Sequence, residues 1–95
     1  MRVHFVGIGG AGMSALARVL IQMGYEVSGS DLVCSEATRR LAGQGAVIFE
    51  GHRAGQVGNP DLVVVSAAVP PDNVEVEEAR SRGLPIVGRS ELLAR

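Results

Sequence analysis

The sequence predicts an α/β fold, a doubly wound parallel sheet of five strands in the order 3-2-1-4-5. Three observations support this fold class. Short apolar runs alternate with stretches of helical periodicity, a glycine-rich turn joins the first run to the first helical stretch, and an acidic residue closes the second run. Right-handed crossovers between parallel strands give that order, so the direction of winding reverses between the first and the fourth strand.

The strands are expected at residues 2–6, 26–31, 46–49, 61–66 and 84–88. The run at 61–66 is rich in β-branched residues and should lie in the centre of the sheet. Pro85 lacks a backbone donor, so the last strand is expected at an edge. Residues 53–60 contain two glycines and a proline, which predicts an irregular connection or a frayed short helix.

Helices are expected at residues 13–23, 36–43, 73–82 and 91–95, and each has a recognisable start or stop signal. Gly24 ends the first helix in the left-handed conformation, and Ser35 caps the second. Asp72 with Glu75 has the spacing of a capping box for the third helix. Ser90 caps the last helix, which stops soon after it begins and indicates a fragment of a longer protein.

Several polar side chains are interpreted as structural. His4 is expected to be a packed or partly exposed core residue of the first strand. On the second helix, Arg39 and Arg40 should form a solvated outer face. Its inward side is expected to consist of Ala37, Leu41 and Ala42. The third helix carries Glu75, Glu77 and Glu78 in its first half, where the helix dipole favours solvated negative charge.

The glycine-rich turn is the main candidate for a binding site. Gly7, Gly9 and Gly12 have the pattern G-x-G-x-x-G at the junction of a strand and a helix. Such a turn lets the backbone approach a diphosphate closely, and the free amides at the helix start bind phosphate with the help of the helix dipole. No Arg or Lys occurs between residues 3 and 17. The pattern therefore predicts a nucleotide site in which main-chain amides replace basic side chains.

Other residues should reach the same edge of the sheet. Asp31 follows the last motif glycine by about 20 residues, the distance at which this kind of fold places a carboxylate on a ribose. The small residues Ser66 and Ala67 end the fourth strand next to the switch point, where a ligand could approach. His52 follows the third strand and so lies at the same edge. Because no nucleophile or second metal ligand accompanies it, it is interpreted as a binding contact only and not as part of a catalytic set.

Composition excludes several classes of function. The chain has 95 residues, enough for one domain over residues 1–95, and its formal net charge of −1 comes without any basic cluster, which argues against nucleic-acid binding. All positive side chains are Arg, so the chain has no lysine for a phosphate-binding loop or a Schiff base. Cys34 is the single cysteine, which excludes an internal disulfide, gives no metal site and fits the cytoplasm. No stretch is long and apolar enough to enter a membrane.

The motifs together resemble a known family. The runs 7–14 (GIGGAGMS), 24–31 (GYEVSGSD), 64–69 (VVSAAV) and 89–91 (RSE), with Gly51-His52, are similar to the N-terminal domain of the Mur ligases, above all the UDP-N-acetylmuramate–L-alanine ligases. The similarity covers essentially the whole chain. The related ligases that attach a whole peptide to the same sugar have a similar domain with a less similar glycine loop.

The resemblance implies a role for each candidate residue. The diphosphate of UDP-N-acetylmuramate would lie on the amides of residues 9–14, that is Gly9, Gly10, Ala11, Gly12, Met13 and Ser14. Ser66 and Ala67 would face it, Ser30 and Asp31 would reach the uridine, and His52 matches a family position with a less defined role. In the family, central and C-terminal domains complete an enzyme that uses ATP and Mg²⁺ in the cytoplasm to add L-alanine during peptidoglycan synthesis. The resemblance thus implies that residues 1–95 hold no cofactor, metal or catalytic residue and bind only the UDP end.

The alternative from another functional class is an NAD-binding module, either regulatory or part of an oxidoreductase. The same glycines and Asp31, as a ligand for ribose hydroxyls, would serve that function equally well. Spacing alone does not separate the two functions.

Overall fold

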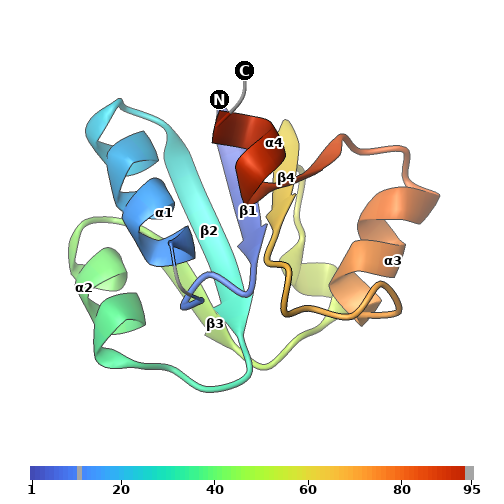
Figure 1. Ribbon diagram of the computed structural model, residues 1–95, viewed down its shortest axis with the longest axis horizontal. Helices are drawn as coiled ribbons and strands as arrows, with labels where there is room; N and C mark the ends of the chain where they lie inside the picture. Colours follow the sequence, from blue (N-terminus) through green and yellow to red (C-terminus); the bar gives the residue numbers. More distant parts are fainter. Residues whose placement is uncertain (11, 94–95) are drawn as a thin grey trace.

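The computed structural model describes residues 1–10 and 12–93 and confirms the doubly wound α/β fold (Figure 1). Its sheet has five strands, all parallel, in the order β3-β2-β1-β4-β5. The strands are β1 (Arg2–Val6), β2 (Glu26–Asp31), β3 (Val47–Glu50), β4 (Leu62–Val65) and β5 (Ile86–Gly88). The predicted strand order is therefore correct, with the winding direction changing between β1 and β4.

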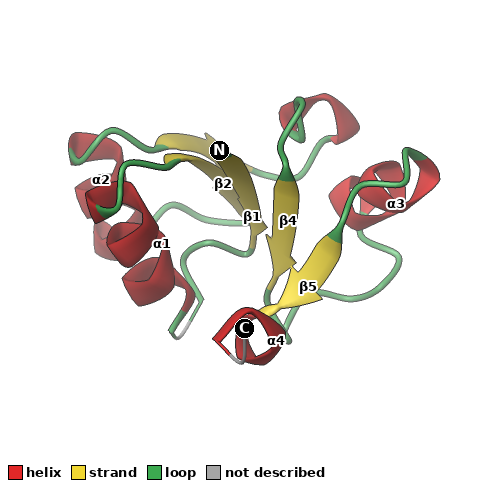
Figure 2. Cartoon of the chain, turned by 90° about the horizontal axis from the view of Figure 1, so that it is seen from above, coloured by secondary structure: helices red, strands yellow, loops and turns green. Residues whose placement is uncertain are grey.

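Helices cover both faces of the sheet. They are α1 (Met13–Gln22), α2 (Glu36–Gly43), α3 (Val74–Ser81) and α4 (Arg89–Leu93), with a short 3₁₀ turn, η1 (Ala54–Gln56). In Figure 2 the helices α1 and α2 lie on one side of the sheet and α3 lies on the other. Among the described residues, no helix has the length and apolar character needed to span a membrane.

The two faces of the sheet carry separate apolar cores. On the α1 and α2 side, the buried cluster includes Phe5, Ile8 and Met13. On the other side, a smaller cluster contains Val6, Val63 and Val76. The alternation of side chains along β1 explains this division, because successive residues of a strand point to opposite faces.

The boundaries of several elements differ from the prediction. β3 begins one residue later than expected, and β4 and β5 are shorter. The inward face of α2 holds Thr38 rather than Ala42, because the Thr38 hydroxyl and Ser35 form a reciprocal capping box that turns this side chain inward. The prediction of a capping box by Asp72 is wrong, since Asn73 caps α3 by accepting hydrogen bonds from the first-turn amides. The last helix starts at Arg89, and its expected end at residues 94–95 lies outside the described residues.

The strand register brings the candidate loops to one edge of the sheet. Val6 at the end of β1 pairs with Ser30 on one side and with Val65 on the other. The glycine turn, Asp31 and Ser66 each follow these positions directly, so they meet at the carboxyl edge of the sheet.

Candidate functional site

The glycine turn is bound tightly to the neighbouring strand. Gly7 has a φ of 83°, and the amides of Gly7 and Ile8 both donate to the Ser30 carbonyl of β2, at 2.8 and 3.0 Å. Gly12 has a φ of 76° and occupies the N-cap position of α1. Both positions lie in the left-handed region that favours glycine, which explains two of the three glycines of the motif.

Several amides of this turn already have partners inside the protein. The Gly9 amide donates to Asp31 Oδ2 at 2.8 Å, Gly10 donates to the Gly7 carbonyl, and Met13 donates to the Gly10 carbonyl. These three amides of the segment expected to hold the diphosphate are therefore not free. Gly12 occupies the N-cap position of α1, and Ser14 belongs to its first turn. The amides of these two residues lie at the start of α1, at the positive end of its dipole.

Arg89 brings a positive charge to this helix start from the far end of the chain. A Cβ atom on Gly12 would lie 2.9 Å from both Cζ and Nη1 of Arg89, so the guanidinium packs directly against the Gly12 backbone. The Arg89 residue is exposed to solvent. A guanidinium beside the positive end of a helix is electrostatically unfavourable unless an anion joins the two. This geometry therefore favours an anion at the start of α1.

Ser66 and Ala67 lie where the sequence placed them. A Cβ atom on Gly10 would lie 3.2 Å from Ser66 Oγ, and one on Gly7 would lie 2.9 Å from Ser66 Cβ. The Ser66 hydroxyl accepts a hydrogen bond from the Ala68 amide, and Ala67 is exposed. The end of β4 therefore borders the glycine turn directly, as predicted.

Ser30 and Asp31 face the protein more than the solvent. Ser30 is fully buried, and its hydroxyl lies 3.0 Å from Glu75 Oε1 and 2.9 Å from His52 Nδ1. Besides holding the Gly9 amide, the Asp31 carboxylate accepts a hydrogen bond from the Leu32 amide. Contact of either side chain with a uridine stays a prediction, and the geometry favours it for Asp31 over Ser30 because only Asp31 is partly exposed.

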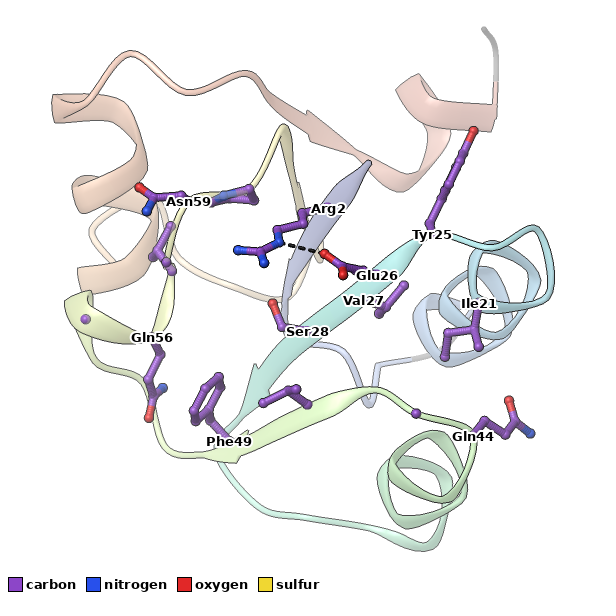
Figure 3. Close-up of a pocket in the computed structure, with 16 residues that line it drawn as sticks. Arg2, Ile21, Tyr25, Glu26, Val27, Ser28, Gln44, Phe49, Gln56 and Asn59 are labelled. Atoms are coloured by element: carbon purple, nitrogen blue, oxygen red, sulfur yellow. Dashed lines mark hydrogen bonds and ion pairs between the residues drawn. The ribbon is translucent and has the colours of Figure 1, made fainter.

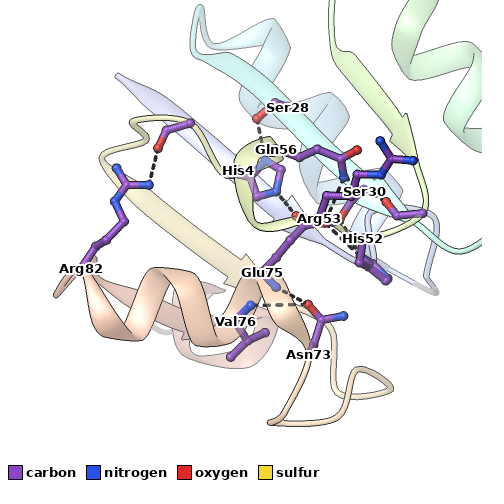
Figure 4. Close-up of polar contacts among 12 residues, drawn as sticks. His4, Ser28, Ser30, His52, Arg53, Gln56, Asn73, Glu75, Val76 and Arg82 are labelled. Carbon is purple, nitrogen blue, oxygen red and sulfur yellow. Dashed lines mark hydrogen bonds and ion pairs between the residues drawn. The ribbon is translucent and has the colours of Figure 1, made fainter.

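A buried polar cluster around Glu75 lies behind this edge of the sheet (Figure 4). Glu75 is completely buried, and its Oε1 lies 2.6 Å from His4 Nε2. Its Oε2 accepts hydrogen bonds from the Arg53 amide at 3.1 Å and from Gln56 Nε2 at 3.2 Å. The interpretation of Glu75 as a solvated carboxylate is therefore wrong, whereas His4 is a packed core residue as expected.

Burial and hydrogen bonding act on the Glu75 carboxyl in opposite directions. Burial alone would raise the pKa of Glu75, because it disfavours the charged form. Hydrogen bonds from His4, Ser30 and His52 stabilise the carboxylate more strongly and hold the pKa of Glu75 below its ordinary value. Glu75 is thus a negatively charged acceptor within the core.

His52 connects this cluster to the surface. Its Nδ1 lies 3.1 Å from Glu75 Oε2 and 2.9 Å from the Ser30 hydroxyl, and its side chain is 11% exposed. His52 is therefore held from behind by the core while one edge of its ring reaches the carboxyl edge of the sheet. This position is compatible with the predicted binding contact.

A groove of about 580 Å³ lies elsewhere, over β2 and β3 (Figure 3). Its lining includes Ser28, Phe49 and Gln56, and an ion pair of 2.6 Å between Arg2 and Glu26 lies beside it. The groove exists because the connection between β3 and β4 contains only the short turn η1 and not a full helix. None of the predicted site residues lines it.

The described residues hold no group of three or more His, Cys, Asp or Glu side chains that could bind a metal ion. The chain also has no lysine. The phosphate-binding loop of many ATP sites uses a lysine, so the residues present do not form a loop of that kind.

Sequence reasoning missed two residues of this region. Arg89 was not assigned a role, although its position directly after the last strand of a parallel sheet places it at the same edge as the glycine turn. Glu75 was assigned to solvent because its position on the helix fits a dipole-favoured charge. The pairing of His4 and His52 with the Glu75 carboxylate has no sequence signal at separations of 71 and 23 residues.

Comparison with known proteins identifies the family of this chain. The sequence pattern described as "Mur ligase family, catalytic domain" matches residues 2–95. A UDP-N-acetylmuramate–L-alanine ligase from Chlorobium luteolum is 58% identical over 93 residues, which are 97% of this chain and 20% of the relative. The chain thus spans about a fifth of the length of the curated relatives it matches.

Solved structures give the same result. The UDP-N-acetylmuramate–alanine ligase of Thermotoga maritima superimposes with a TM-score of 0.94 at 42% identity, over 98% of this chain and 22% of that one. A murein peptide ligase of Psychrobacter arcticus gives a TM-score of 0.83 at 32% identity, over 90% of this chain and 18% of that one. An imine reductase of Bacillus cereus, at 20% identity and a TM-score of 0.66, shows the likeness of fold alone. The conclusion is that this chain belongs to the Mur ligase family.

Proposed function

We propose that this chain binds the UDP end of UDP-N-acetylmuramate, as the N-terminal domain of a cytoplasmic, ATP-dependent ligase that adds L-alanine in peptidoglycan precursor synthesis. The support is twofold. The relatives that match nearly the whole chain are named for this reaction, and the carboxyl edge of the sheet carries a site suited to an anion.

The observation that carries the proposal is the position of Arg89 against the start of α1. A diphosphate there would accept hydrogen bonds from the Gly12 and Ser14 amides and neutralise the Arg89 guanidinium. Gly9 and Gly10 shape the turn, and Ala11 and Met13 belong to the same segment. Ser66 and Ala67 leave room for the ligand on the opposite side, because neither has a large side chain.

The nucleoside would lie toward the ends of β2 and β3. Asp31 ends β2 and His52 follows β3, and both side chains are partly exposed, so we assign them to the ribose and base. Ser30 would act from behind by holding His52 and not through direct contact.

The chemistry of the ligase belongs to the rest of the enzyme. Because this chain has no lysine and its described residues have no cluster of metal ligands, ATP and Mg²⁺ would bind in parts that it does not include. The central and C-terminal domains of the same ligase are accordingly the proposed partners, together with UDP-N-acetylmuramate. We expect the 95-residue chain to bind without catalysing a reaction.

Titration calorimetry with UDP, UDP-N-acetylmuramate and NADH tests this proposal. We expect both uridine ligands to bind and NADH not to bind. Arg89→Gln should weaken UDP binding by about 10- to 100-fold, because a hydrogen bond to a charged group contributes about 1.5–3 kcal/mol. Arg80→Gln is the matched control, since Arg80 is an exposed arginine on α3, and it should leave the affinity unchanged.

Two results would contradict the proposal. Tighter binding of NADH than of UDP would favour the NAD-binding module. Equal UDP affinity in the Arg89→Gln and Arg80→Gln variants would show that the diphosphate does not bind at the start of α1. Gly9→Val is unsuitable as a test of the diphosphate site. A Cβ atom on Gly9 would lie 2.8 Å from Asp31 Oδ2 and 3.2 Å from Thr38 Cγ2, so the larger side chain would distort the protein itself.

A further inference from the structure

We propose that Glu75 is a positioning residue that holds the His52 ring in a single tautomer, with hydrogen on Nδ1, so that Nε2 accepts a hydrogen bond from the nucleoside of the bound ligand. The ligand group would be an O–H or N–H donor, either a ribose hydroxyl or the imide N–H of the base. This inference rests on the proposed nucleotide site, and it goes further by assigning a role to a buried residue of α3.

The first step is the number of donors that surround Glu75. Its two carboxylate oxygens lie within hydrogen-bond distance of His4 Nε2, the Ser30 hydroxyl, His52 Nδ1, the Arg53 amide and Gln56 Nε2. Four elements or turns contribute to this set, and Glu75 is completely buried. A carboxylate in such a shell only accepts hydrogen bonds, so every facing atom must present a hydrogen.

The second step fixes the tautomer of His52. An unprotonated Nδ1 would direct its lone pair at Glu75 Oε2, 3.1 Å away, which is repulsive. The Ser30 hydroxyl has one hydrogen, and it is donated to Glu75 Oε1 at 3.0 Å. The same hydroxyl therefore acts as an acceptor toward His52 Nδ1 at 2.9 Å. Both contacts require hydrogen on Nδ1, and a neutral His52 ring then carries a lone pair on Nε2.

The third step concerns where this lone pair is. Among the described residues, no buried side-chain nitrogen or oxygen lacks a hydrogen-bond partner. His52 Nε2 makes no hydrogen bond to these described residues, so it must reach solvent, which agrees with the 11% exposure of the side chain. The ring is thus anchored through Nδ1 and presents Nε2 outward.

The fourth step relates His52 to the glycine turn. Ser30 joins the two, because its carbonyl accepts the Gly7 and Ile8 amides while its hydroxyl contacts His52 Nδ1. A ligand with its diphosphate at the start of α1 can therefore extend along the ends of β2 and β3 toward His52. The phosphates and uracil carbonyls are acceptors, so a free Nε2 selects the hydroxyl or imide donors of the nucleoside.

Nitrogen-15 NMR of the imidazole rings tests the tautomer in the ligand-free chain. The sequence has two histidines, so the spectrum of His52→Ala identifies the His4 signals. With both rings neutral, we expect hydrogen on Nδ1 of His52. Glu75→Gln should shift His52 toward the tautomer with hydrogen on Nε2, while Glu77→Gln, an exposed residue of the same helix, should leave it unchanged. A wild-type His52 with hydrogen on Nε2 would overturn the proposal.

A double-mutant cycle on UDP affinity tests the functional part. We expect His52→Ala and Glu75→Gln each to weaken binding by about five- to tenfold, and the double variant to lose no more than His52→Ala alone. Additive losses would show that Glu75 has a merely structural role and would overturn the proposal. If Glu75→Gln fails to fold, two measurements still test the proposal: the tautomer of His52 in the wild-type chain and the UDP affinity of His52→Ala. An affinity of His52→Ala equal to that of the wild type would overturn the proposal.

UDP analogues that lack the 2′ hydroxyl, the 3′ hydroxyl or the imide hydrogen identify the donor. One analogue should bind the wild-type chain more weakly than UDP but bind His52→Ala as UDP does. If the wild-type preference for UDP persists in His52→Ala for all three analogues, His52 does not accept a hydrogen bond from the nucleoside. Failure of the wild-type chain to bind UDP would instead refute the proposed function, and the NMR result would still report on Glu75 and His52.

Discussion

At the scale of single residues, Glu75 shows how an ordinary sequence position acquires an unusual environment. Its place in the first turn of α3 fits a charge stabilised by the helix dipole, and two other acidic residues follow it. Only the folded chain places His4, from the central strand, 2.6 Å from its carboxylate. Glu75 also accepts hydrogen bonds from the Arg53 amide and Gln56, and it thereby supports the turn after β3 that borders the candidate site.

The lowered pKa of Glu75 predicts a specific dependence of stability on pH. Because the folded pKa lies below the ordinary value of 4.5, Glu75 contributes its full stability above pH 4.5 and loses it as the pH falls through the folded pKa. Chemical denaturation should show Glu75→Gln less stable than wild type by about 1–3 kcal/mol at neutral pH. This difference should narrow below pH 4.5. Glu77→Gln should follow the wild type, and a constant difference for Glu75→Gln would contradict the prediction.

At the scale of elements, the start of α3 decides where Glu75 is held. The Asn73 side chain accepts hydrogen bonds from the Glu75 amide at 2.8 Å and from the Val76 amide at 3.4 Å. Asp72, one residue earlier, is also a good capping residue by type, and it lies exposed outside the helix. The sequence thus contains two adjacent candidates, and packing of Glu75 and Val76 into the protein selects the second.

The effect of capping can be measured by a pair of neighbouring substitutions. Asn73→Ala should lower the free energy of unfolding by about 1 kcal/mol, because the first-turn amides of α3 lose their acceptor. Asp72→Ala should change it by less than about 0.5 kcal/mol, as expected for an exposed position. Urea denaturation of both variants gives the comparison. A larger loss of unfolding free energy for Asp72→Ala than for Asn73→Ala would show that Asp72 caps α3, as the sequence alone suggested.

At the scale of the whole molecule, the sheet separates two apolar cores of unequal size. Each core is modest, yet both contain residues of β1 and β4, so neither can form without the central strands. The five strands and the helices on both faces should therefore behave as one cooperative unit. The short link between β3 and β4 does not interrupt this unit, because η1 packs against α3.

One cooperative transition is the corresponding prediction for the 95-residue chain. Tyr25 is the single tyrosine and the chain has no tryptophan, so its fluorescence reports on the region between α1 and β2. Far-ultraviolet circular dichroism reports on all elements together. The two urea transitions should coincide, as a two-state domain requires. Loss of the Tyr25 signal before the circular dichroism signal would show that the α1 side unfolds separately.

Local chemistry in the sequence was sufficient for the strand order, the glycine turn and the placement of Ser66 and Asp31 at one edge. Alternating apolar runs, turn residues and right-handed crossovers act over short distances, and these determine the topology of a parallel sheet. These local signals did not decide whether Asn73 or Asp72 caps α3, because both residues are good helix caps by type.

Tertiary structure alone decided that the Gly9 amide is bonded to Asp31, that Arg89 lies against Gly12, and that Glu75 is buried between two histidines. The physical reason is the same in each case. A hydrogen bond or charge contact between residues far apart in the chain depends on where the sheet brings them. The residues next to each partner in the sequence do not indicate which distant residue it will contact.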